Sequence, residues 1–90
     1  MKTIFKSKFD KQFKRAPQNI QNAVSVRLKL FASNPDHPLL RNHKLSGKYQ
    51  GCRSINMTGD WRAIFEEVDP ILDDPYIEFI ALGTHSQLYK

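Results

Sequence analysis

The stretch CRSINMTGDWRAIFEEV, residues 52–68, holds two runs of alternating side chains separated by a polar turn. In the first run Arg53, Ile55 and Met57 point one way and the residues between them point the other, which is the period of a β-strand. The second run, residues 61–68, has the same period, and the Thr-Gly-Asp between the runs is typical of a turn. The stretch therefore predicts an antiparallel hairpin.

C-terminal to the hairpin, the acidic and proline-bounded segment DPILDDP, residues 69–75, leads into the apolar run YIEFIAL, residues 76–82. This run predicts a third strand, ended by Gly83 and Thr84. Three consecutive strands joined by short connections favour an antiparallel sheet.

N-terminal to the hairpin, the pattern is helical. After a short strand candidate at residues 3–5, Ser7 and Asp10 match a capping box, which predicts a helix that ends near Ala16. Pro17 suits the first turn of a second helix.

The second helix carries apolar residues at helical spacing, and the sequence SNPDHP ends it because a residue before proline is disfavoured in the α conformation. The predicted order is β-α-α-β-β-β in a single domain, residues 1–90. We expect an α+β fold with two N-terminal helices packed on a small antiparallel sheet.

Charge divides the chain unevenly. Residues 1–59 contain twelve Lys or Arg and only two acidic residues, a net charge of +10, whereas residues 60–90 contain two basic and seven acidic residues, a net charge of −5. A basic body of this size favours polyanionic partners, although a merely solvated basic surface is the alternative.

No apolar run approaches the ~20 residues of a membrane span, and the N-terminus lacks the pattern of a secretory signal. We therefore expect a cytoplasmic protein without membrane contact. Cys52 has no second cysteine to pair with and is interpreted as a small buried residue.

Four residues carry groups able to transfer protons or stack on a base: His43, Asp60, His85 and Tyr89. For each of them a structural role is the alternative. His37 lies between Asp36 and Pro38 and is interpreted as an ordinary loop residue. No metal-binding motif is present, and we expect neither a metal site nor a cofactor.

Cations surround these groups. Arg53 shares a strand face with apolar residues and needs a partner or a substrate anion, and Arg62 on the paired strand is expected to face a common groove with it. Lys44 and Lys48 add positive charge. RNA supplies its own nucleophile, the 2′-OH, so a base, an acid and cations suffice to cleave it.

The segments HKLSGKYQGCRSINMTGDWRAIFEE, residues 43–67, and FIALGTHSQLYK, residues 79–90, contain the pieces H-x-L-x-G, D-W and G-T-H-x-x-L-Y in order. The chain resembles the RelE/ParE superfamily of type II toxin-antitoxin toxins, and is most similar to the YafQ-type messenger-RNA interferases.

The resemblance implies a toxin that cleaves messenger RNA in the ribosomal A site and is held inactive by an antitoxin, as a monomer when free and a hetero-oligomer in the complex. It implies catalytic roles for His85, His43 and Asp60, and base placement by Tyr89.

The chain departs from the family at one position. YafQ-like toxins place a histidine before the D-W turn, where this chain has Asn56, which cannot exchange a proton near neutral pH. Asn56 is expected to orient the RNA, with Arg53, Arg62, Lys44 and Lys48 holding phosphate. Two alternatives remain open: a ParE-like gyrase poison on the same fold, and a homologue that binds an antitoxin but has weakened catalysis.

Overall fold

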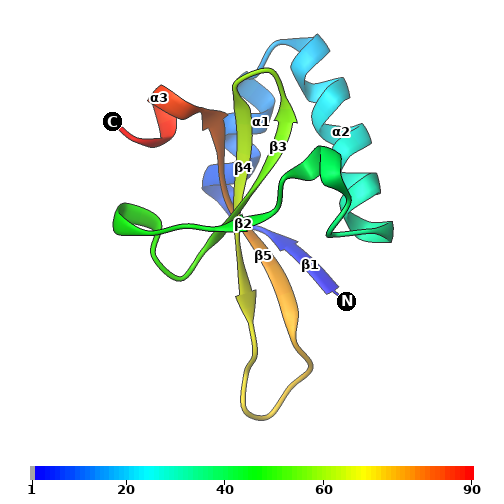
Figure 1. Cartoon of the computed structure of the whole chain (residues 1–90), viewed down its shortest axis with the longest axis vertical. Helices are drawn as coiled ribbons and strands as arrows, with labels where there is room; N and C mark the ends of the chain where they lie inside the picture. Colours follow the sequence, from blue (N-terminus) through cyan, green and yellow to red (C-terminus); the bar gives the residue numbers. More distant parts are fainter. Residues whose placement is uncertain (1) are drawn as a thin grey trace.

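The computed structural model describes residues 2–90 (Figure 1). The elements in chain order are β1 (Lys2–Phe5), α1 (Ser7–Arg15), α2 (Gln18–Ser33), the 3-10 turn η1 (Pro38–Leu40), β2 (His43–Lys44), the 3-10 turn η2 (Gly47–Tyr49), β3 (Arg53–Thr58), β4 (Trp61–Val68), β5 (Tyr76–Thr84) and α3 (His85–Leu88).

The strands form one sheet in the order β1-β5-β4-β3-β2. The predicted α+β fold is confirmed, and the three antiparallel strands from residue 53 to residue 84 form its centre. The sheet is mixed, because β1 pairs with β5 in parallel, and the short strand β2, which the sequence did not predict, extends the other edge. A parallel pair requires a long crossover, which α1 and α2 provide.

One face of the sheet is covered by α1 and α2. Phe9 from α1 and Val24 and Phe31 from α2 are buried against the strands, where Phe65 and Phe79 are at most 1% exposed. The phenylalanine rings pack with centroids 5.0 to 5.6 Å apart, the separation that aromatic pairs favour. None of the helices between residues 2 and 90 has the length and hydrophobicity that crossing a membrane requires.

The opposite face is covered only in part. In a smaller apolar cluster, Tyr49 of η2 and Leu88 of α3 pack against Ile64 and Ala81 of the strands. In Figure 1, α2 and α3 lie on opposite sides of the central strands, and α1 passes behind them. We call this side the open face, because part of it is left uncovered and forms the groove described below.

Two capping patterns in the sequence have different outcomes. The predicted Ser7 cap is wrong, since Ser7 is the first helical residue of α1 and the preceding Lys6 makes no side-chain cap. The real capping box is at α3, where Thr84 accepts from the Gln87 N–H and the Gln87 side chain accepts from the Thr84 N–H. This box turns the chain out of β5 and into α3.

The β3–β4 hairpin contains a register shift. Thr58 pairs with Trp61 beside the turn, whereas Asn56 pairs with Arg62, so Met57 is an extra residue that shifts the register by one. Such a bulge changes which residues of the two strands share a face. Here it places Asn56 and Arg62 side by side on the open face.

The connection between β4 and β5 projects away from the helices at one end of the molecule (Figure 1). Ile71 and Leu72 at its tip are 98% and 97% exposed. Six of the nine acidic residues of the chain lie between positions 66 and 78, so negative charge gathers around this end.

Candidate active site

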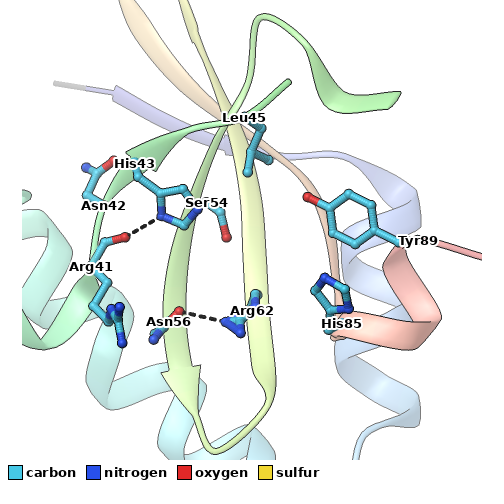
Figure 2. Close-up of a pocket in the computed structure, with 9 residues that line it drawn as sticks. All are labelled: Arg41, Asn42, His43, Leu45, Ser54, Asn56, Arg62, His85 and Tyr89. Atoms are coloured by element: carbon cyan, nitrogen blue, oxygen red, sulfur yellow. Dashed lines mark hydrogen bonds between the residues drawn. The ribbon is translucent and has the colours of Figure 1, made fainter. Parts of the chain in front are cut away.

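A groove of about 620 Å³ lies on the open face of the sheet. Figure 2 shows its lining, which comes from the segment around β2 on one side, β3 and β4 on the floor, and α3 on the other side. The lining residues are Arg41, Asn42, His43, Leu45, Ser54, Asn56, Arg62, His85 and Tyr89.

His43 stands on the β2 wall and has a fixed orientation. Its Nδ1 lies 2.7 Å from the carbonyl oxygen of Arg41. Because a carbonyl only accepts hydrogen bonds, Nδ1 must carry the proton, and the neutral ring then has its lone pair on Nε2. The contact thus selects the tautomer in which Nε2 can take up a proton.

His85 and Tyr89 stand on the α3 wall, both exposed, with ring centroids 4.8 Å apart. The buried Leu88 anchors this helix, and its carbonyl accepts from Tyr49 Oη and from Lys48 Nζ, each at 3.0 Å. Lys48, predicted to hold phosphate, is therefore engaged in seating α3 and does not line the groove.

The floor between the two walls carries Arg62. Its Nη1 donates to Asn56 Oδ1 at 2.9 Å, and its Nη2 lies 3.8 Å from Asp60 Oδ1 (Figure 2 shows the first contact). The second oxygen of Asp60 accepts from the backbone N–H of His85 at 3.3 Å. Asp60 lies outside the lining and connects the hairpin turn, Arg62 and the first residue of α3.

The expected common groove for Arg53 and Arg62 is wrong. Arg53 lies on the helix-covered side, in a second pocket, and its Nε donates to Asn42 Oδ1 at 2.8 Å. The cause is the extra residue Met57: without the bulge, the register at the turn would place Arg53 opposite Glu66 and on the face of Arg62. Lys44 pairs with Arg53 across β2 and β3 and also lies outside the groove.

Four lining residues were not predicted as site residues: Arg41, Asn42, Leu45 and Ser54. Ser54 had a visible signal, because the alternation already put it on the face of Asn56. It is 2% exposed, and its hydroxyl is the one buried side-chain polar atom without a hydrogen-bond partner between residues 2 and 90. A buried hydroxyl without a partner costs about 1–3 kcal/mol.

Cys52 is partly buried against the smaller apolar cluster, in line with its predicted structural role. Burial raises the pKa of its thiol, and the negative charge of Glu66 raises that pKa further, while Lys6 acts in the opposite direction. A thiol held in its neutral form is a poor nucleophile.

Comparison with solved structures places this fold among bacterial and archaeal toxins. The crystal structure of YafQ from E. coli strain BL21(DE3) superimposes with a TM-score of 0.78 at 22% identity, covering 98% of this chain and 97% of that one. YafQ in the E. coli DinJ-YafQ toxin-antitoxin complex gives 0.76 at 22% identity, with coverage of 98% and 96%. The RelB-RelE antitoxin-toxin complex of Methanococcus jannaschii gives 0.68 at 20% identity, with coverage of 96% and 94%.

The fold is thus the one seen in the YafQ and RelE structures. The family model described as the bacterial toxin of type II toxin-antitoxin systems, YafQ, matches residues 1–90, and the chain belongs to this family. No curated protein matches the sequence. The resemblance seen in the short motifs is thereby confirmed over the whole chain, and the protein is a type II toxin.

Proposed function

We propose that this toxin is a ribosome-dependent endoribonuclease that cleaves messenger RNA in the A site and so stops translation. The observation that carries the proposal is the pair of histidines on opposite walls of one cationic groove, with an arginine on the floor between them (Figure 2). A module that only binds its target has no need of two proton-transfer groups in this arrangement.

In the proposed reaction, the base removes the proton of a ribose 2′-OH, and the 2′ oxygen attacks the neighbouring phosphorus. The bond from phosphorus to the 5′ oxygen breaks, and the acid gives that oxygen a proton. The products are a 2′,3′-cyclic phosphate and a 5′-OH. The entering and leaving oxygens lie on opposite sides of the phosphorus, so the base and the acid belong on opposite walls.

His43 is assigned as the base, because its bond to the Arg41 carbonyl leaves the lone pair on Nε2. His85 is assigned as the acid on the other wall. Arg62, held by Asn56 and Asp60, stabilises the charge that develops on the phosphate oxygens. Asn56 therefore orients this arginine, and Tyr89 offers a ring on which an unpaired base stacks.

We infer that the partner of the free toxin is a co-expressed antitoxin. Solved relatives have been captured as the DinJ-YafQ and RelB-RelE complexes. The net charge of +10 over residues 1–59 favours an antitoxin segment rich in acidic residues.

The test is to induce the toxin without an antitoxin and map the 5′ ends of cellular messages. Wild type should arrest growth and produce cuts in register with codons, with 5′-OH ends. His85→Ala should lower cleavage by roughly 10²–10⁴-fold, the usual contribution of a general acid. His37→Ala is the matched control, because His37 lies outside the groove, where it accepts from the Leu39 N–H.

Arrest with intact messages would overturn the proposal, and accompanying DNA breaks would favour the gyrase-directed alternative. A folded wild-type protein that neither arrests growth nor cuts messages on ribosomes would support the alternative of a catalytically weakened homologue.

A further inference from the structure

Arg41 has an unusual backbone. It is the one non-glycine residue with positive φ between residues 2 and 90, at φ 48° and ψ 47°, the left-handed conformation. Side chains other than glycine disfavour this region, and such residues gather at functional sites. The turn that ends η1 at this residue directs its carbonyl at His43 and places its side chain in the groove lining.

The guanidinium of Arg41 is unengaged. Arg27, Arg53 and Arg62 each donate to an oxygen of the protein, whereas the Arg41 side chain has neither a hydrogen bond nor an ion pair within the described part of the chain. Figure 2 shows it on the β2 wall, with Asn56 between it and Arg62. An exposed guanidinium beside a groove has five donors free for an anion.

We propose that Arg41 forms a second phosphate subsite of the groove, which holds the RNA phosphate next to the one that is cleaved. This proposal rests on the function proposed above. Arg62 contacts the reacting phosphate, and Arg41, on the wall of the base, contacts its neighbour along the strand. The subsite takes the role that the sequence assigned to Arg53, which lies on the other face of the sheet.

If Arg41 served only to hold His43 in place, replacing its side chain would leave RNA binding unchanged as long as the backbone kept its conformation. The carbonyl contact with His43 belongs to the backbone, so any residue that accepts the left-handed conformation preserves it. Glycine accepts that conformation most readily. Arg41→Gly therefore removes the guanidinium while it keeps the orientation of His43, and it should raise the thermal unfolding midpoint.

The experiment measures binding of a fluorescein-labelled single-stranded oligoribonucleotide of ten uridines across a salt series. All proteins carry His85→Ala, so that the probe is not cut. A plot of log affinity against log salt concentration has a slope proportional to the number of phosphates contacted, about 0.7 per phosphate for single strands. Arg41→Gly should reduce the slope by about 0.7, and Arg41→Lys should preserve it.

Arg15→Gln is the matched control, since it removes an exposed guanidinium at the end of α1, outside the groove, and its slope should equal that of the parent. An unchanged slope in a folded Arg41→Gly protein overturns the subsite. An unchanged slope combined with weaker binding of the co-expressed antitoxin also overturns it, and assigns Arg41 to the protein partner.

Message cleavage is measured in a separate experiment, with toxin that retains His85. A lowered slope in Arg41→Gly supports the subsite even where wild-type toxin leaves messages intact, and that second result would count against the proposed reaction alone.

Discussion

The two faces of the sheet use the same strands in opposite ways. On the helix-covered face, five phenylalanines from α1, α2 and the strands pack against one another: Phe5, Phe9, Phe31, Phe65 and Phe79. Four of them are buried, and Phe5 at the edge is 38% exposed. The β3–β4 hairpin adds Ile55, Met57 and Ala63 to this core. The residues that alternate with them on the same hairpin, Ser54, Asn56 and Arg62, line the groove on the open face. Stability and chemistry are therefore assigned to alternate residues of one β-hairpin.

This separation has a physical advantage. A polar group on the helix-covered face would need a buried partner, whereas one on the open face keeps water or a substrate as its partner. The walls of the groove are short segments, β2 and α3, each held by a few specific hydrogen bonds. Residues in these walls can therefore be substituted without a change in the packing of the helix-covered core.

The largest expected effect is on the helix-covered face. Phe79→Ala removes a ring that is 0% exposed and contacts four others, so it should lower the free energy of unfolding by about 3–5 kcal/mol, a large part of the usual 5–15 kcal/mol. Urea unfolding followed by circular dichroism measures it. Tyr89→Ala on the open face should change the same quantity by less than about 1 kcal/mol, and a loss comparable to that of Phe79→Ala would erase the distinction between the faces.

The next effect concerns coupling on the open face. Because Asn56 holds Arg62, Asn56→Ala and Arg62→Gln should each slow message cleavage, and the double variant should be little slower than Arg62→Gln alone. The coupling should be about 0.5–3 kcal/mol, measured as a double-mutant cycle on cleavage rates. The control cycle of Asn56→Ala with Arg53→Gln should be additive, because these residues lie on opposite faces. Additive effects in the first cycle would show that Asn56 acts on the substrate independently of Arg62.

The sequence predicted the strands well because alternation is a local signal, and β3 and β4 appear as expected. The third strand, predicted at residues 76–82, continues two residues further, through Gly83 and Thr84. The sequence did not predict the parallel pairing of β1, which depends on residues more than seventy positions apart. His43, His85 and Tyr89 were selected from the sequence, and the structure brings all three into the lining of one groove. Arg53 was misplaced, because a simple two-residue hairpin register would put it on the face of Arg62, and the one-residue bulge changes that register. The apolar residues that share a face with Arg53 were the local signal of its true position. The left-handed turn at Arg41 was missed because glycine, the usual signal, is absent.

A smaller effect is expected where α3 joins the sheet. Tyr49→Phe removes one of two donors to the Leu88 carbonyl and should cost about 1 kcal/mol, which lowers the thermal unfolding midpoint by roughly 4–8 °C. Cleavage should fall as well, because α3 carries His85. Tyr76→Phe is the matched control, since its hydroxyl has no hydrogen bond within residues 2–90. A loss of stability without any change in cleavage would show that the packing of α3 on the sheet does not affect the position of His85.

The smallest effect concerns the thiol on the open face. Burial raises the pKa of Cys52, so in alkaline solution the unfolded chain loses the thiol proton before the folded chain does. Its contribution to stability is complete below the unfolded pKa and declines as pH rises through the folded pKa. Unfolding free energies measured from pH 7 to about 10 should therefore fall more steeply for wild type than for Cys52→Ala. Parallel declines in the two proteins would contradict the assignment.

The acidic end of the β4–β5 hairpin gives the whole molecule an electric dipole. Negative charge collects around the projecting connection, while α3, which forms one wall of the groove, lies toward the other end of the long axis (Figure 1). In the field of a polyanion, this distribution exerts a torque that turns the acidic end outward and the groove inward before any contact forms. The rate of productive encounter should then decrease with added salt. Salt screens charges that are further apart than a Debye length, about 8 Å at physiological ionic strength, so the long-range torque is lost while close contacts persist.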